Sequence, residues 1–126
     1  MTFVDSNVFM YAVGRPHPLR AQAQRFFENA MQDRSPLATS AEVLQELLYA
    51  YLPVDRLDTL DAAWTLADSL TTIWPVDPDD VRHARSLITR HGGLSARDLL
   101  HLACCQRRDV DDLMTFDRSL VAAWQS

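Results

Sequence analysis

The stretch SARDLLHLACCQRRDVDDLMTFD, residues 95–117, combines a helical pattern with that of a short strand. Ser95 offers a side-chain oxygen to a helix N-terminus, and apolar residues then recur at helical spacing to about Arg107. Residues 112–116 predict a strand, and Asp117 follows it directly. The stretch contains five aspartates, and their meaning depends on where the other acids of the chain fall.

Outward from this stretch, short strand candidates alternate with helical patterns along the chain. Strands are predicted at residues 2–4, 36–38 and 73–76, and helical patterns at 7–11, 19–31, 39–50, 55–71, 77–90 and 118–124. This alternation predicts a single α/β domain, residues 1–126, with a short, mostly parallel β-sheet flanked by helices. In such sheets ligands bind at the carboxyl ends of the strands.

The composition favours a cytoplasmic globular protein. A chain of 126 residues with 48% hydrophobic content is long enough to bury a core. No apolar run approaches the roughly 20 residues needed to cross a bilayer, and the N-terminus lacks the basic leader of a signal peptide. Cys104 and Cys105 are neighbours in a helical pattern and make poor disulfide partners. We therefore expect no membrane association and a reducing compartment.

The charged residues exclude several chemistries. A net charge of −5 argues against broad, nonspecific attraction to nucleic acid, although local patches and bound cations still permit a nucleic-acid enzyme. All 12 basic residues are arginines, because the chain contains no lysine. The absence of lysine excludes the phosphate-binding P-loop and Schiff-base catalysis.

Four acids from four separate segments are predicted at the carboxyl edge of the sheet. Asp5 ends the first strand, and Asp117 follows the last. Glu46 lies about one turn into the helix after the second strand, and Asp98 lies in the first turn of another helix. Carboxylates held close together repel one another unless they are protonated or neutralised by cations. Hard divalent ions that prefer oxygen ligands, Mg²⁺ or Mn²⁺, are the natural partners of such a site.

Three of these acids also fit a helix-capping role. Asp98 stands three residues after Ser95, which is the spacing of a capping box. Asp5 is placed to cap a turn that begins at Asn7, and Asp117 is placed to cap the last helix. Both interpretations remain open for each residue.

The remaining acids separate into capping and solvent-exposed residues. Glu42 stands three residues after Thr39 and is assigned to a capping box, which leaves Glu46 for chemistry. The acids of residues 109–112 form a charge run that we expect to face solvent, with Asp112 as an alternative ligand. His101, three residues beyond Asp98, is interpreted as a buried structural histidine rather than a metal ligand.

Four segments of the sequence resemble the motifs of PIN-domain nucleases, in particular the VapC-type toxins of bacterial toxin–antitoxin pairs. The motifs occur in family order, and the resemblance extends from Thr2 to Leu120. The matching segments are FVDSNVFMYA with Asp5 and Asn7, TSAEVLQELLYA with Glu46, LSARDLLHLA with Asp98, and LMTFDRSL with Thr115 and Asp117.

The resemblance implies a PIN-like three-layer fold and a metal-dependent endoribonuclease. It implies that Mg²⁺ or Mn²⁺ binds at Asp5, Asp98 and Asp117, with Glu46 as the fourth catalytic acid. Either Glu46 or Asp117 accepts the proton of the attacking water, and both assignments remain open. Asn7 and Thr115 are expected to orient ligands or bound waters.

The resemblance also implies partners. RNA is the expected substrate, a VapB-like antitoxin the expected inhibitor, and a homodimer the expected assembly. Because the acids repel RNA, we expect arginines around the site to bind its phosphates, with Arg97 and Arg118 first and Arg15 next. The helices at 41–51 and 55–72 form an apolar pair that offers a groove to an antitoxin segment.

Alternative functions differ in how well they fit the sequence. Receiver domains and haloacid-dehalogenase-type phosphatases place aspartates at a sheet edge, but both need a lysine, and the phosphatases need a second aspartate where Asn7 stands. A non-catalytic PIN-like module that binds RNA or protein is the main alternative, although the complete acid set argues against it. A housekeeping RNA-processing nuclease is the other.

Overall fold

Four short strands form one parallel sheet at the centre of the molecule, in the order β3-β2-β1-β4. The computed structural model describes residues 1–108 and 110–126. Every pairing in this sheet is parallel, which confirms the predicted α/β class. The strands are β1 (Thr2–Val4), β2 (Leu37–Ser40), β3 (Thr71–Trp74) and β4 (Asp112–Met114).

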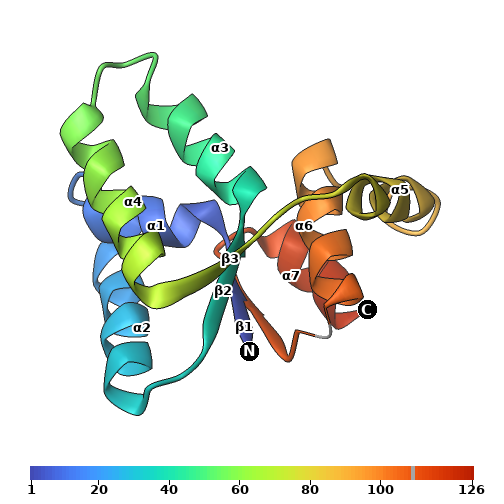
Figure 1. The fold of residues 1–126 in the computed structure, drawn as a ribbon, viewed down its shortest axis with the longest axis horizontal. Helices are drawn as coiled ribbons and strands as arrows, with labels where there is room; N and C mark the ends of the chain where they lie inside the picture. Colours follow the sequence, from blue (N-terminus) through green and yellow to red (C-terminus); the bar gives the residue numbers. More distant parts are fainter. Residues whose placement is uncertain (109) are drawn as a thin grey trace.

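Helices cover the sheet on both sides and complete a three-layer arrangement (Figure 1). One side carries α1 (Ser6–Val13), α2 (Arg20–Asp33), α3 (Ala41–Tyr51) and α4 (Leu57–Leu70). The other side carries α5 (Pro78–Ser86), α6 (Ala96–Arg107) and α7 (Arg118–Gln125). In the part of the chain that the structure describes, no helix is long and apolar enough to span a membrane.

The core is built around β1, which lies between β2 and β4. Phe3 and Val4 of this strand are fully buried, and Phe9 of α1 and Leu102 of α6 pack into the same cluster. A central parallel strand is covered on both faces, so its side chains are apolar without alternation. Asp5 directly follows β1. Because β1 is the central strand, Asp5 lies at the sheet edge and is buried there.

The helix-start signals of the sequence are largely confirmed. The Ser95 hydroxyl accepts a hydrogen bond from the Asp98 N–H at the start of α6, and Asp117 caps α7. Asp77 and Asp80 exchange the two hydrogen bonds of a capping box at the start of α5. These devices depend on residues close in sequence, which is why the pattern predicts them.

The capping box predicted between Thr39 and Glu42 is wrong. The cap of α3 is Ser40, whose hydroxyl accepts a hydrogen bond from the Val43 N–H. Thr39 still belongs to β2, and its hydroxyl donates to the carbonyl of Val4 on the neighbouring strand, 2.8 Å away. The Thr39 hydroxyl therefore bonds to the neighbouring strand and does not cap the helix as the local pattern had predicted.

Several element ends differ from the prediction. Helix α1 extends over eight residues rather than a single turn, and α5 ends at Ser86 rather than near Arg90. Strand β3 begins two residues earlier than expected, and β4 ends at Met114 rather than Phe116. Beyond Met114 the chain leaves the ladder because Phe116 donates its N–H to the Asn7 side chain instead.

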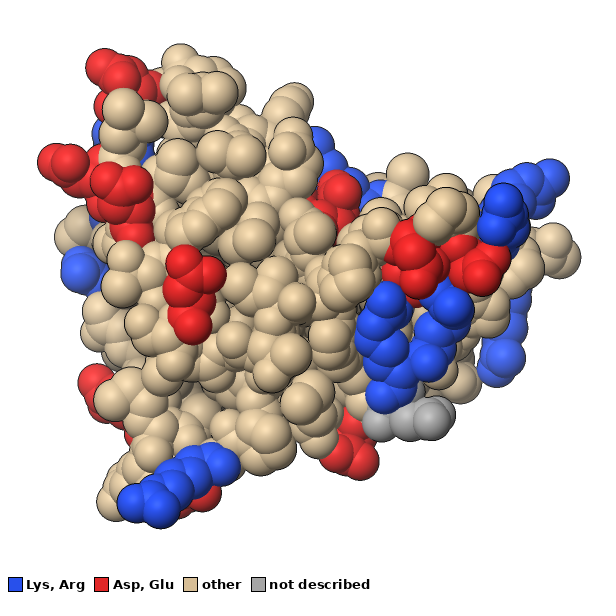
Figure 2. Space-filling model, viewed as in Figure 1, with Lys and Arg blue, Asp and Glu red and all other residues tan. Residues whose placement is uncertain are grey.

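Arginine side chains fasten α5 to α6 through a buried carboxylate. Asp80 is fully buried and accepts hydrogen bonds from Arg107 and Arg108 at 2.6 and 2.7 Å. Arg108 also donates to the carbonyl of Pro75 and lies 5.3 Å from the ring centre of Trp74. Figure 2 shows arginines and acids side by side over this part of the molecule.

Candidate active site

Asp5 is fixed at the carboxyl end of β1, where it also caps α1. The residue is 4% exposed, and its Oδ1 atom accepts a hydrogen bond from the Ser6 N–H at 2.7 Å. Oδ2 accepts from the Thr115 hydroxyl at 2.7 Å and from the Asn7 side chain at 3.4 Å. The N-terminus of a helix favours a negative charge at this position. Capping and a place in the acid site therefore coexist in one residue.

Asn7 and Thr115 connect the first turn of α1 to the segment after β4. The Asn7 amide donates to the Thr115 hydroxyl at 3.2 Å, and its oxygen accepts from the Phe116 N–H at 3.2 Å. The Thr115 hydroxyl also accepts from the Asp117 N–H at 3.0 Å. These bonds fix the positions of Asp5 and Asp117 relative to each other, although the two residues are far apart in sequence.

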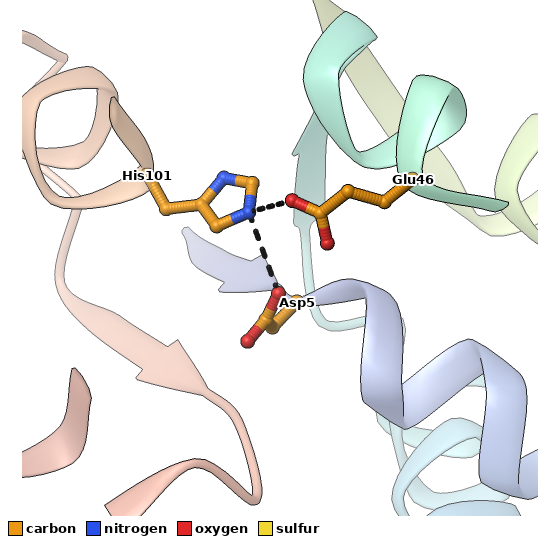
Figure 3. A group of neighbouring side chains, drawn as sticks. All are labelled: Asp5, Glu46 and His101. Atoms are coloured by element: carbon orange, nitrogen blue, oxygen red, sulfur yellow. Dashed lines mark hydrogen bonds and ion pairs between the residues drawn. The ribbon is translucent and has the colours of Figure 1, made fainter. Parts of the chain in front are cut away.

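Glu46 of α3 meets His101 of α6 across the edge of the sheet (Figure 3). The Nε2 atom of His101 lies 2.5 Å from Glu46 Oε1 and 3.6 Å from Asp5 Oδ1. The Ser6 hydroxyl donates to Glu46 Oε2. Asp5, Glu46 and His101 each offer a ligand atom, and these atoms lie within 4.8 Å of one another.

The contact between Glu46 and His101 changes the ionisation of both groups. Burial opposes ionisation of Glu46, but the hydrogen bond and charge of His101 outweigh it, so the pKa of Glu46 lies below its ordinary value. Burial also opposes protonation of His101, which is 1% exposed. The bond to Glu46 and the charge of Asp5 outweigh this effect and raise the pKa of His101. Each group therefore favours the charged form of the other.

Asp98 and Asp117 form a second acid pair beside the first. Burial and the negative charge of Asp117 raise the pKa of Asp98 to about 6, and the charge of Asp5 contributes further. Asp117 accepts hydrogen bonds from the Ser119 and Leu120 N–H groups through Oδ1, at 2.9 and 3.2 Å. The negative charges of Asp117 and Asp5 thus repel the charge of Asp98. No arginine is among the residues that influence Asp98 most.

All four predicted acids thus reach the same edge of the sheet. The site has two parts: Glu46 with His101, and Asp98 with Asp117. Asp5 contributes to both, because it lies near His101 and its charge raises the pKa of Asp98. The donors are mostly carboxylate oxygens, and their mutual repulsion falls when a cation binds between them. This donor set fits a divalent metal ion with oxygen ligands.

His101 and Ser6 are the site residues that the sequence interpretation missed. The spacing of Asp98 and His101 put both on one helix face, but it gave no sign of Glu46, 55 residues away. Ser6 stands between two motif residues, and only the fold shows that its hydroxyl reaches Glu46. His101 is buried as expected, yet it belongs to the acid cluster rather than to the apolar core alone.

The three predicted phosphate-binding arginines lie in three different surroundings. Arg97 stacks over the Tyr49 ring, 4.6 Å from its centre, and its charge acts on Glu46. Arg118 borders a hollow with Thr115 and Phe116. Arg15 borders another hollow at the end of α1.

The alternative ligand Asp112 is excluded by the register of the sheet. Asp112 pairs with Thr2, at the opposite end of β1 from Asp5. Its carboxylate accepts a hydrogen bond from the Leu113 N–H and is exposed, as expected for the charge run. Asp111 is exposed and pairs with the N-terminal amine, whereas Asp109 lies outside the described residues.

Comparison with known proteins identifies the family. The PIN domain model matches residues 2–123. Ribonuclease VapC23 of Mycobacterium tuberculosis is 60% identical over 126 residues, which covers the whole of both chains. The chain belongs to the VapC-type PIN-domain family.

Solved PIN structures share the fold. M. tuberculosis VapC20, a toxin that cleaves the sarcin–ricin loop, matches with a TM-score of 0.81 and 20% identity over 98% of this chain and 95% of its own. A toxin–antitoxin complex from Klebsiella pneumoniae matches with a TM-score of 0.67 and 18% identity over 93% and 87%. The predicted PIN-like three-layer fold is confirmed.

Proposed function

We propose that this PIN domain is a metal-dependent endoribonuclease and the toxin of a type II toxin–antitoxin pair. The observation that carries the proposal is the convergence of Asp5, Glu46, Asp98 and Asp117 at one sheet edge. His101 and Arg97 offset part of the charge at Glu46, whereas Asp98 faces Asp117 and Asp5, and carboxylates held close together in this way are costly unless a cation binds between them. The full-length relative named a ribonuclease supports the same activity.

Mg²⁺ or Mn²⁺ is the proposed ion, bound by Asp5, Asp98 and Asp117. When bound, the ion supplies acidity to a water molecule and neutralises charge on the phosphodiester. Asn7 and Thr115 hold Asp5 through its Oδ2 atom. They thereby set the direction in which that carboxylate faces the substrate.

Glu46 is proposed to orient the attacking water. Two donors, the Ser6 hydroxyl and His101 Nε2, hold its two oxygens and leave its carboxylate little freedom. A group fixed in this way contributes to catalysis by alignment as well as by charge. Glu46 and Asp117 remain the two candidates for the proton acceptor, and comparison of Glu46→Gln with Asp117→Asn would separate them.

Cleavage of a mixed RNA pool with Mg²⁺ or Mn²⁺ tests the proposed site. We expect Asp5→Asn and Asp98→Asn each to lower the cleavage rate by roughly 100- to 1,000-fold, the range found when a charge-stabilising group is removed from an active site. Asp61→Asn, an exposed acid on α4, is the matched control and should cleave like the wild type. Wild-type rates in both site variants would contradict the proposal. Metal-independent RNA binding without cleavage would favour a non-catalytic module.

A VapB-like antitoxin is the proposed partner, and the turn between α3 and α4 is its proposed contact. Tyr49 and Leu52 there are 63% and 62% exposed, and Val54 and Leu57 add further exposed apolar surface. Figure 2 shows a largely uncharged face in the middle of the molecule, with acids gathered at its upper left, where this turn lies. An inhibitor that lies along this surface could extend an arginine towards the acids, where its charge would replace that of the metal.

Copurification with the antitoxin tests this contact. We expect Leu52→Asp to abolish copurification, because a carboxylate at the centre of an apolar contact is costly to bury. Met31→Asp, at an equally exposed position on α2, is the matched control and should retain the partner. Equal recovery with both variants would contradict the proposed surface. Light scattering of the free toxin would test the proposed homodimer.

A further inference from the structure

A set of aromatic rings lies at the corner between α1 and α2, beside the acid site. The rings of Tyr11 and His17 stack with centres 4.4 Å apart and planes inclined by 26°. The Tyr11 ring also meets Phe116 edge to face, with centres 5.5 Å apart. The proposed cleavage chemistry uses none of these three rings.

His17 is exposed to solvent and yet fixed in position. One face of its ring rests on Tyr11, and its Nδ1 atom accepts a hydrogen bond from the Leu19 N–H at 3.1 Å. Its backbone carbonyl accepts a further bond from the Arg20 N–H. An exposed ring that is already ordered loses little conformational freedom when a ligand stacks on its open face.

The rings are close to the acids along two routes. Tyr11 stands four residues after Asn7 on α1, so both lie on one helix face about one turn, or roughly 5.4 Å, apart. Phe116 stands directly before Asp117 and donates its N–H to Asn7. Both routes place Tyr11 and Phe116 next to residues that bind or adjoin the acids of the site.

The charge around the rings suits a nucleic acid. A hollow of about 240 Å³ is lined by Tyr11 and His17 together with Arg15 and Arg56, and no carboxylate belongs to its described lining. Arg56 already contacts the Thr59 hydroxyl, whereas Arg15 is exposed. Rings flanked by arginines are how proteins hold single-stranded RNA, because bases stack on the rings and phosphates meet the cations. The local positive charge contrasts with the net charge of −5 of the whole chain.

We propose that the Tyr11–His17 stack, with Arg15, is a subsite for one unpaired base of the RNA next to the cleaved bond. The base continues the stack on the open face of His17, and Arg15 meets its phosphate. This inference rests on the proposed ribonuclease function. RNA suits the hollow better than a protein segment does, because the surface combines a flat ring with arginines, whereas the exposed α3–α4 surface is apolar.

Binding of short RNAs to the Asp98→Asn variant, with Mg²⁺ present, tests the subsite while the RNA stays intact. The probes are fluorescein-labelled oligouridine of ten nucleotides and an equally long strand of abasic riboses, followed by fluorescence anisotropy. We expect His17→Ala in this background to weaken oligouridine binding by roughly 5- to 150-fold, which is the contribution of one stacked base. His17→Phe keeps a ring and should stay within about threefold of the parent. Both variants should bind the abasic strand like the parent.

Three results would overturn the inference. One is equal oligouridine affinity in His17→Ala and the parent, and another is a parent protein that binds the abasic strand as well as oligouridine. The third is loss of antitoxin binding in His17→Ala with RNA binding unchanged, which would assign the rings to the protein partner. RNA cleavage by the wild type, measured in parallel, shows whether the ribonuclease proposal survives any of these results.

A second variant, Arg15→Gln, leaves the rings in place. It should weaken the binding of both oligouridine and the abasic strand, and it should lower the slope of log affinity against log salt concentration by about one.

Discussion

Two acid clusters on this small domain are built in opposite ways. Between α5 and α6, Asp80 is fully buried, yet Arg107 and Arg108 donate to it and the Asp77 N–H donates as well. Burial opposes its ionisation, but these bonds outweigh burial and hold the pKa of Asp80 well below its ordinary value. At the sheet edge, Asp98 is only partly buried, and burial and the Asp117 charge raise its pKa to about 6.

The difference lies in the partners rather than in the depth of burial. A buried carboxylate with two arginines has its charge neutralised by the chain itself, and it fastens one element to another. Asp98 has Asp117 and Asp5 as its main charged neighbours, and the charge of His101 offsets their repulsion only in part, so a cation from outside would stabilise its charged form. In this protein the first arrangement marks a structural acid, and we interpret the second as the mark of a functional one.

The largest expected effect is on stability and comes from the structural acid. We expect Asp80→Asn to lower the free energy of unfolding by about 3 kcal/mol, because it leaves two arginines without their shared carboxylate. Asp79→Asn, which removes an exposed pair with Arg82, is the neighbouring control and should change stability by less than about 1 kcal/mol. Urea unfolding measures both variants. Similar losses in the two would remove the distinction between the buried and the exposed pair.

The next effect belongs to the functional acids and depends on the ion. Mg²⁺ at about 100 times its dissociation constant should stabilise the wild type by roughly 2.7 kcal/mol, as expected for a ligand that binds only the folded state. Asp98→Asn should lose most of this gain, whereas Asp79→Asn should keep it. Thermal unfolding with and without Mg²⁺ measures the difference. An equal gain in Asp98→Asn and the wild type would show that the ion binds elsewhere.

The smallest effect is a pH dependence of the metal-free protein. The pKa of Asp98 is about 6 in the folded chain, against 3.8 as its ordinary value, so the folded state binds the proton more tightly. Its contribution to stability is therefore complete below about pH 4 and is lost as the pH rises through 6. Because Asp98 is partly exposed, solvent reduces the effect to about 1 kcal/mol.

The difference in stability between wild type and Asp98→Asn isolates this titration from that of other groups. The wild type should lose about 1 kcal/mol relative to the variant between pH 4 and pH 7. Urea unfolding at a series of pH values measures it in the presence of a chelator. A constant difference across that range would contradict the proposed repulsion between Asp98 and Asp117.

The local pattern was reliable where neighbours in the sequence make the contact. Ser95 and Asp117 were predicted as helix caps, and each accepts a bond from an N–H two or three residues ahead. The same logic failed at Thr39, because the adjacent strand offered its hydroxyl a better acceptor. Local rules therefore hold until a residue distant in sequence competes for the same side chain.

The sequence by itself determined the fold class and the edge at which the acids meet. Strands and helices alternate in it, and parallel strands carry the residues after them to one edge. Tertiary structure alone decided how the charges pair. His101 binds Glu46 across 55 residues, and Arg108 binds Asp80 across 28. Periodicity records only which face of an element is apolar, and the partner of a polar side chain depends on which elements the packed core brings together.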